Sequence, residues 1–189
     1  MNENELAGLL ESLRRMGSDD LSVEVKESAT TLSRDVWETV SAFANTAGGI
    51  IVLGVSERAG FVPVENFETE KVLNQFVAGM GDAGGRGKLA NPPKYTIERV
   101  ELQGTVVLVI TIEEIDPSSK PCYVIERGAQ GGSYKRIDDK DVPLSSTEVL
   151  SLASYERTSL SDRDAVPGAG VDNLDEALVD RTIERAFSL

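Results

Sequence analysis

The chain has 189 residues, of which 40% are hydrophobic and 27% charged, a balance typical of a globular domain with room for a short appendage. It contains no histidine, so Ser-His-Asp and Cys-His catalytic sites and His-ligated zinc sites are excluded. Any bound metal would be a hard cation such as Mg²⁺ or Mn²⁺, held by carboxylates. The net charge of −13 disfavours a protein whose whole surface coats a phosphate backbone, so contact with nucleic acid would need a local basic patch.

Three features of the sequence indicate a cytoplasmic protein that does not enter a membrane. The first residues, Met1 to Glu5, are acidic and lack the basic-then-apolar pattern of a signal peptide. The longest apolar run, Gly49 to Val55, is too short to cross a bilayer. Cys122 is the single cysteine, so no internal disulfide can form, which fits a reducing compartment.

The first half of the chain alternates predicted helices and strands. Leucines spaced on one face predict a helix from Asn4 to Met16, and alternation predicts a strand from Leu21 to Lys26. Ser33 is the expected cap of a second helix, which buries Val36, Val40 and Phe43 and stops at Gly48-Gly49 in left-handed backbone. The run from Ile50 to Val55 is apolar on both faces, which predicts a central strand.

The second half continues with shorter elements. A helix from Glu68 to Ala78 is followed by a Gly- and Pro-rich loop, residues 79–93. This loop contains a G-x-G-x-x-G match, but the match follows a helix rather than a strand, so it does not predict a dinucleotide site. The remaining expected elements are strands Tyr95–Leu102 and Thr105–Ile112 turning at Gln103-Gly104, a strand pair Cys122–Ile125 and Ser133–Ile137 around the loop 128–132, and a helix opened by a capping box at Ser145–Glu148.

Composition divides the chain into three parts. Residues 1–157 are expected to form one domain, and residues 158–171, rich in Ser, Asp, Gly and Pro, a linker. Residues 172–189 are predicted to form a helix that begins, or docks on, a further domain.

The most specific segment is Ser41-Ala42-Phe43-Ala44-Asn45-Thr46-Ala47-Gly48-Gly49. Asn45 and Thr46 lie in the last helical turn, where their side chains could bond freed backbone groups or reach a ligand. Together with Val23-Glu24-Val25-Lys26, Leu53-Gly54-Val55 and Tyr134-Lys135-Arg136, this segment resembles the Schlafen-type AlbA domain over about residues 19–155. The resemblance implies an α/β (α+β) fold with a mixed sheet flanked by helices. It also implies DNA or RNA binding, as the first module of a bacterial transcriptional regulator whose downstream domain is ATPase-like.

Two segments are locally basic. Residues 79–100 and residues 127–140 each carry a net charge of +2 on an acidic chain. Basic loops can follow a phosphate backbone while Tyr95 or Tyr134 stacks on bases, although solvated surface loops have the same composition. The candidate nucleic-acid-binding residues are Asn45, Arg86, Lys88, Lys94, Arg127, Lys135 and Arg136.

Some members of the family are similar in a further respect, since they carry a carboxylate trio and cut RNA with a divalent metal. The matching positions are Asp19, Glu24 and Glu57, which could hold Mg²⁺ or Mn²⁺, while Lys26 would neutralise charge on the phosphate. Glu24 and Lys26 could equally be elements of the family fold. Three functions therefore stay open: a nucleic-acid-binding module, a metal-dependent endoribonuclease, and an assembly module that forms a homodimer within an ATP-binding regulator. Whether the chain is an enzyme also stays open.

Overall fold

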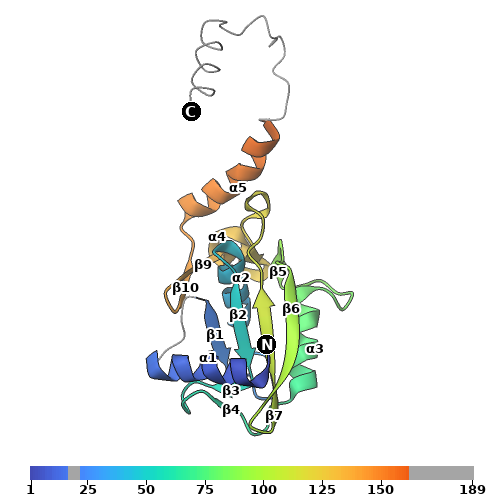
Figure 1. Ribbon diagram of the computed structural model, residues 1–189. Coiled ribbons are helices and arrows are strands. Elements are labelled where there is room, and N and C mark those ends of the chain that lie inside the picture. The colour runs from blue at the N-terminus through green and yellow to red at the C-terminus, as the bar shows by residue number, and fades with distance from the viewer. Residues whose placement is uncertain (17–21, 162–189) are drawn as a thin grey trace, which may run out of the picture. The chain divides into compact units, whose positions relative to one another are not determined.

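The computed structural model describes residues 1–16 and 22–161 of the chain (Figure 1). The chain divides into two compact units, Met1–Glu156 and Arg157–Leu189, and the first carries the elements on which the candidate site depends. The helix predicted at residues 172–189 and most of the predicted linker lie outside the described residues.

A four-stranded mixed sheet forms the centre of the first unit. Its strands are β1 (Val23–Lys26), β2 (Gly49–Leu53), β7 (Thr105–Ile112) and β6 (Tyr95–Leu102), in that order across the sheet. β1 and β2 are parallel, which the intervening helix α2 (Val36–Asn45) makes possible, and the other two pairs are antiparallel. The predicted hairpin, with its turn at Gln103-Gly104, is confirmed, and so is the mixed α/β fold.

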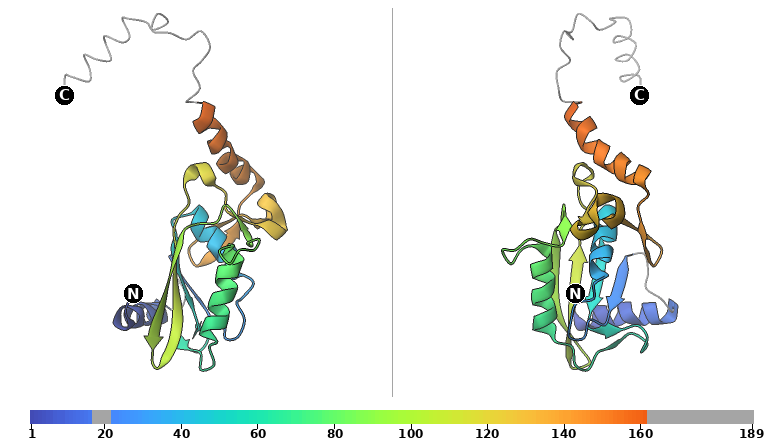
Figure 2. Two further views of the ribbon diagram at one scale, coloured as in Figure 1. Left: turned by 90° about the vertical axis from the view of Figure 1, so that its right-hand side faces the viewer. Right: turned by 180° about the vertical axis from the view of Figure 1, so that it is seen from behind.

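Helices cover both faces of this sheet (Figure 2). Helix α1 (Glu3–Met16) buries Leu6, Leu10 and Leu13 against one face, whereas α2 and α3 (Thr69–Met80) cover the other. Successive residues of a strand point to opposite faces. Val52 therefore joins the α1 core, while Ile51 and Leu53 join the core beneath α2 and α3.

The strand predicted at residues 50–55 is divided in two. Gly54 has a φ of +93°, and a Cβ there would lie 2.5 Å from the ring of Phe67. This bend ends β2 and starts β3 (Val55–Ser56), which pairs with β4 (Val62–Pro63) outside the main sheet.

The prediction for residues 122–137 was partly wrong. The expected strand pair is reduced to a single bridge between Tyr123 and Ser133. Instead, β8 (Tyr123–Val124) pairs with β5 (Leu89–Ala90), and β9 (Tyr134–Ile137) pairs with β10 (Lys140–Pro143). The residues between β8 and β9 form two short helical turns, η2 (Ile125–Arg127) and α4 (Gly128–Gly132), rather than a loop, and a further turn, η1 (Pro117–Ser119), precedes β8.

The last described helix, α5 (Ser146–Ser161), begins at the predicted capping box. The Ser145 N–H donates to the Glu148 carboxylate at 2.8 Å, and the Glu148 N–H donates to the Ser145 hydroxyl at 3.3 Å. The helix continues to Ser161, beyond the predicted start of the linker, because the first Gly and Pro of that stretch come only at residues 167–168. None of the helices within residues 1–16 and 22–161 combines the length and apolar character needed to cross a membrane.

Candidate functional site

The turn from α2 into β2 is held by close packing. Gly48 has a φ of +73°, and a Cβ there would lie 2.6 Å from the Ile112 carbonyl oxygen. A Cβ on Gly49 would lie 2.7 Å from the ring of Phe43. The Gly48 N–H donates to the Phe43 carbonyl at 2.9 Å, which closes the helix in the predicted left-handed conformation.

The Asn45 side chain joins α2 to the segments that carry β8 and β9. Its amide nitrogen donates to the carbonyls of Cys122 at 2.8 Å and Tyr134 at 2.9 Å, and its oxygen accepts from the Cys122 N–H at 2.8 Å. The next residue, Thr46, accepts from the Arg136 N–H at 2.9 Å. With Asn45 only 9% exposed, the amide that was a candidate for nucleic-acid contact is occupied by the protein's own backbone.

A charge network lies beside β1, on the α2 side of the sheet. The two carboxylate oxygens of Glu24 contact Lys26 Nζ and Arg136 Nη1, each at 2.8 Å. Arg136, whose side chain is 1% exposed, also pairs with Asp141 at 3.0 Å, and Lys26 pairs with Asp35 at 2.9 Å. Burial by itself would lower the pKa of Lys26 and of Arg136, but Glu24 and the second carboxylate beside each of them raise the pKa. Both groups therefore stay charged at neutral pH.

The predicted metal trio is only partly within the described residues. Glu24 and Glu57 line one cavity of about 520 Å³ beside β1, whereas Asp19 lies outside the described part. Within residues 1–16 and 22–161, no three acidic, Cys or His side chains are arranged to hold a metal ion. Both oxygens of Glu24 are engaged by cations, and Lys26 is held between two carboxylates. The described donor set by itself does not fit a divalent ion, and the trio stays a prediction.

The predicted basic residues divide into paired and exposed groups. Arg136 is buried in the network, and Lys135 pairs with Glu148. The hydrogen bond from Lys135, followed by those from the Ser145 N–H and hydroxyl, lowers the pKa of Glu148 to about 2. Lys94 is exposed at a cavity of about 360 Å³ that Glu113, Glu114 and Asp116 also line. Arg86 and Lys88 are exposed on the segment between α3 and β5.

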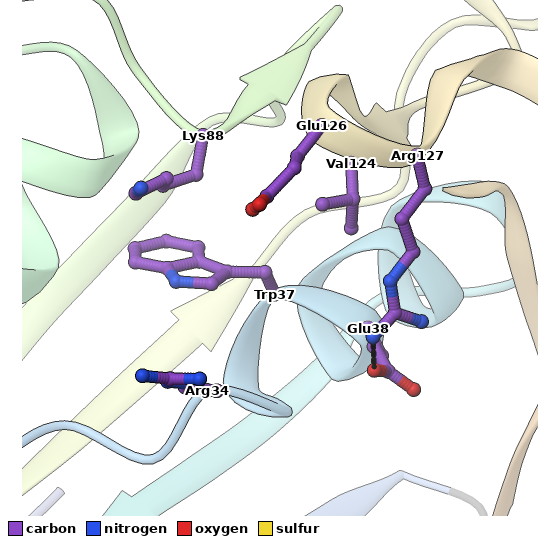
Figure 3. Close-up of a pocket in the computed structure, with 7 residues that line it drawn as sticks. All are labelled: Arg34, Trp37, Glu38, Lys88, Val124, Glu126 and Arg127. Atoms are coloured by element: carbon purple, nitrogen blue, oxygen red, sulfur yellow. Dashed lines mark ion pairs between the residues drawn. The ribbon is translucent and has the colours of Figure 1, made fainter.

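The pairing of β5 with β8 brings the two basic segments together. The Ile125 N–H donates to the Lys88 carbonyl at 2.9 Å, which fixes Lys88 beside the turn that carries Arg127. Between them and the start of α2 lies a pocket of about 570 Å³ (Figure 3). We call it the Trp37 pocket. Its lining residues are Arg34, Trp37, Glu38, Lys88, Val124, Glu126 and Arg127.

Trp37 is held in this pocket by packing on one side of its ring. The indole stacks on Phe76, with ring centroids 5.6 Å apart and an interplanar angle of 22°. It can lie across α3 because residue 79 is glycine, where a Cβ would come within 2.2 Å of the indole. Figure 3 shows Arg34 and Lys88 on opposite sides of the indole.

Arg127 is anchored at the rim of the same pocket. It pairs with Glu38 at 2.6 Å, donates to the Tyr134 hydroxyl, and lies 5.9 Å from the centre of the Tyr134 ring. The pKa of Arg127 is raised, mainly by the charge of Glu38 and to a smaller extent by Tyr134. The ion pairs of the described residues include Arg127 but neither Arg34 nor Lys88.

The sequence prediction included Lys88 and Arg127 but missed Arg34 and Trp37. These two residues are three apart, Arg34 just before α2 and Trp37 in its first turn, and both line the pocket. That spacing was the one available indication of the pocket, and it did not reveal which segment would lie opposite.

A family model and one solved structure agree with this architecture. The family model described as Schlafen, AlbA_2 matches residues 19–145. The solution NMR structure of the N-terminal domain of a RecG-related protein from Nitrosomonas europaea, whose name refers to an ATP-dependent DNA helicase, is 28% identical. That match covers 71% of this chain and 89% of the other, with a TM-score of 0.53. The crystal structure of the DIP2311 protein from Corynebacterium diphtheriae is 15% identical, with coverages of 81% and 29% and a TM-score of 0.46. The comparison with curated proteins found no match.

Proposed function

Because the chain belongs to the Schlafen AlbA_2 family, we propose that it is a nucleic-acid-binding module, with DNA as its first candidate target, in a bacterial transcriptional regulator. The similarity to a domain of a protein named for a DNA helicase supports a role on nucleic acid. The ATP-binding domain expected in such a regulator belongs to the same proposal.

The Trp37 pocket is the observation that carries this proposal. It gathers Arg34, Lys88 and Arg127 from three separate segments of a chain whose net charge is −13. Arg86, two residues before Lys88, is exposed on the same segment. Arginine and lysine side chains are among the main groups that contact phosphate oxygens in nucleic-acid complexes. The exposed cations at this pocket can therefore form the local basic patch that an acidic nucleic-acid-binding protein needs.

The test is binding of a fluorescently labelled DNA, followed by anisotropy over a series of salt concentrations. We expect affinity to fall steeply with salt, and Lys88→Gln to weaken binding and to reduce the slope of log K against log[salt] by about 1. Arg15→Gln is the matched control, because Arg15 is an exposed cation on α1, which covers the opposite face of the sheet. Affinity that is flat with salt, or equal losses in the two variants, would contradict the proposal.

One observation favours the endoribonuclease as a second candidate. Glu24 and Glu57 line the same cavity, so a third carboxylate from Asp19 would complete the trio. Glu57→Gln is the cleaner probe, because Glu57 is exposed whereas Glu24 holds Lys26 and Arg136. If structured RNA is cleaved with Mn²⁺ or Mg²⁺ and Glu57→Gln abolishes cleavage, this function is supported. If neither metal gives cleavage, it is removed.

A further inference from the structure

We propose that the Trp37 pocket binds one unpaired nucleobase together with its phosphate, so that the protein prefers single-stranded to duplex nucleic acid. This inference rests on the proposed function and names the class of substrate at the same site. Four features carry it: the ring geometry of Trp37, the rigidity of its support, the size of the pocket and the charges around it.

Trp37 offers a stacking surface that is already ordered. One side of the indole stacks on Phe76, and Phe76 meets Tyr95 edge-on at 5.5 Å. Phe76 is fully buried, and so are Val36 and Val40, Trp37's neighbours on α2. Trp37 is half-buried and lines the pocket together with the exposed Arg34 and Lys88. Stacking of a base on an aromatic side chain favours binding and tolerates any base, because every base has a π face.

The size of the Trp37 pocket suits a single base that is unstacked and unpaired. A volume of about 570 Å³ lies within the usual range of pockets for small organic ligands. A base inside a duplex already stacks on both of its faces, so it reaches a pocket only after it is unstacked and unpaired, which costs free energy. A single strand avoids most of this cost. The same stacking surface therefore discriminates between single strand and duplex.

The charges match a single backbone phosphate. Three cations and two carboxylates line the pocket, and Arg127 pairs with Glu38. The remaining charged residues of the lining are Arg34, Lys88 and Glu126, whose net charge is +1. A strand has one backbone phosphate, with one negative charge, for each base, whereas a free nucleoside triphosphate carries several negative charges. The balance therefore favours one unit of a strand over a free nucleotide.

The experiment uses Trp37 itself as the reporter, because it is the only tryptophan in the chain. The full chain is titrated with a labelled single-stranded oligonucleotide, with the duplex of the same sequence, and with the corresponding mononucleotide. Anisotropy of the label measures binding, and indole emission measures stacking. We expect the single strand to bind about tenfold more tightly than the duplex and to quench the indole, since about 1.4 kcal/mol of stacking corresponds to that factor.

Two variants separate stacking from a loss of folding. Trp37→Phe keeps an aromatic face and should retain part of the preference for single strands, whereas Trp37→Leu should lower single-strand affinity about tenfold and leave duplex affinity unchanged. Circular dichroism checks that both variants fold, and Arg15→Gln again serves as the charge control. Because Trp37→Phe and Trp37→Leu carry no indole, anisotropy alone is used for them.

The outcomes distinguish this inference from the function on which it rests. Binding of the labelled strand with unchanged Trp37 emission, or with equal affinity for duplex, would overturn the stacking pocket and leave the binding module intact. Quenching by the mononucleotide without binding of the strand would overturn the assignment to single strands. Absence of binding to strand and duplex alike would overturn both proposals.

Discussion

Replacement of Asn45 by alanine tests whether the most specific segment of the sequence serves folding or ligand contact. The amide of Asn45 is hydrogen-bonded to the Cys122 N–H and to the carbonyls of Cys122 and Tyr134, at 2.8–2.9 Å. Ser41 also donates to the Cys122 carbonyl at 2.9 Å, so this oxygen keeps one partner in the variant. Asn45→Ala removes all three bonds, and the Cys122 N–H and the Tyr134 carbonyl are the two groups that lose the partner described here.

The expected cost follows from these two groups. A buried polar group that loses its hydrogen-bond partner costs about 1–3 kcal/mol. Cys122 is fully buried and Tyr134 is 4% exposed, so water reaches neither group easily. We expect Asn45→Ala to lower the free energy of unfolding by about 2–6 kcal/mol, which is a large fraction of the stability of a typical domain.

Urea unfolding followed by circular dichroism measures this change. Asn74→Ala is the matched control, because Asn74 is exposed on α3 and its replacement should change stability by less than about 0.5 kcal/mol. A loss below about 1 kcal/mol for Asn45→Ala would refute the reasoning. If such a stable variant also lost nucleic-acid binding, Asn45 would be a ligand contact, as first predicted from the sequence.

Three further predictions concern single groups. Arg136→Met should lower the free energy of unfolding by about 3–5 kcal/mol, because it leaves the carboxylates of Glu24 and Asp141 without their shared partner. Chemical denaturation measures this loss of stability. A loss below about 1 kcal/mol would contradict the buried network. Burial raises the pKa of the Cys122 thiol to about 12, so thiol reagents should label the native protein far more slowly than the unfolded chain, and equal rates would show that the site opens readily. The folded pKa of Glu148, about 2, lies below its ordinary value of 4.5, so its pairing stabilises the fold above pH 4.5 and this stabilisation is lost as the pH falls toward 2. Glu148→Gln should therefore melt at a lower temperature than the parent at neutral pH but not near pH 2, and a difference that persists in acid would exclude this linkage.

Local patterns were sufficient to predict most of the elements. The spacing of leucines located α1, alternation and the Gln103-Gly104 turn located the β6–β7 hairpin, and the Ser145–Glu148 capping box located the start of α5. In each case neighbours in sequence determine the structure through helix periodicity, turn conformation or end-capping. The segment from Ser41 to Gly49 predicted the family through its resemblance, and the structure gives its glycines a reason: a Cβ on Gly48 would meet the Ile112 carbonyl and one on Gly49 the ring of Phe43.

The partners of the short strands could not be predicted from the sequence. β5 and β8 have two residues each, too few for a pattern, and they find one another across more than thirty residues of chain. That pairing also determines where the predicted Lys88 and Arg127 meet the unpredicted Arg34 and Trp37. The basic stretch of residues 127–140 looked uniform in sequence, yet Arg136 is buried between carboxylates while Arg127 lies half exposed at the pocket.

By itself, the sequence determined the longer helices, the main hairpin, the family and the need for a local basic patch on an acidic chain. Only the tertiary structure decided which cations are neutralised and which remain exposed. The physical reason is that an element forms from contacts within a few residues, whereas the charge state of a surface depends on carboxylates that approach from distant segments. Glu24 reaches Arg136 across more than one hundred residues, and Trp37 rests on Phe76 from another helix.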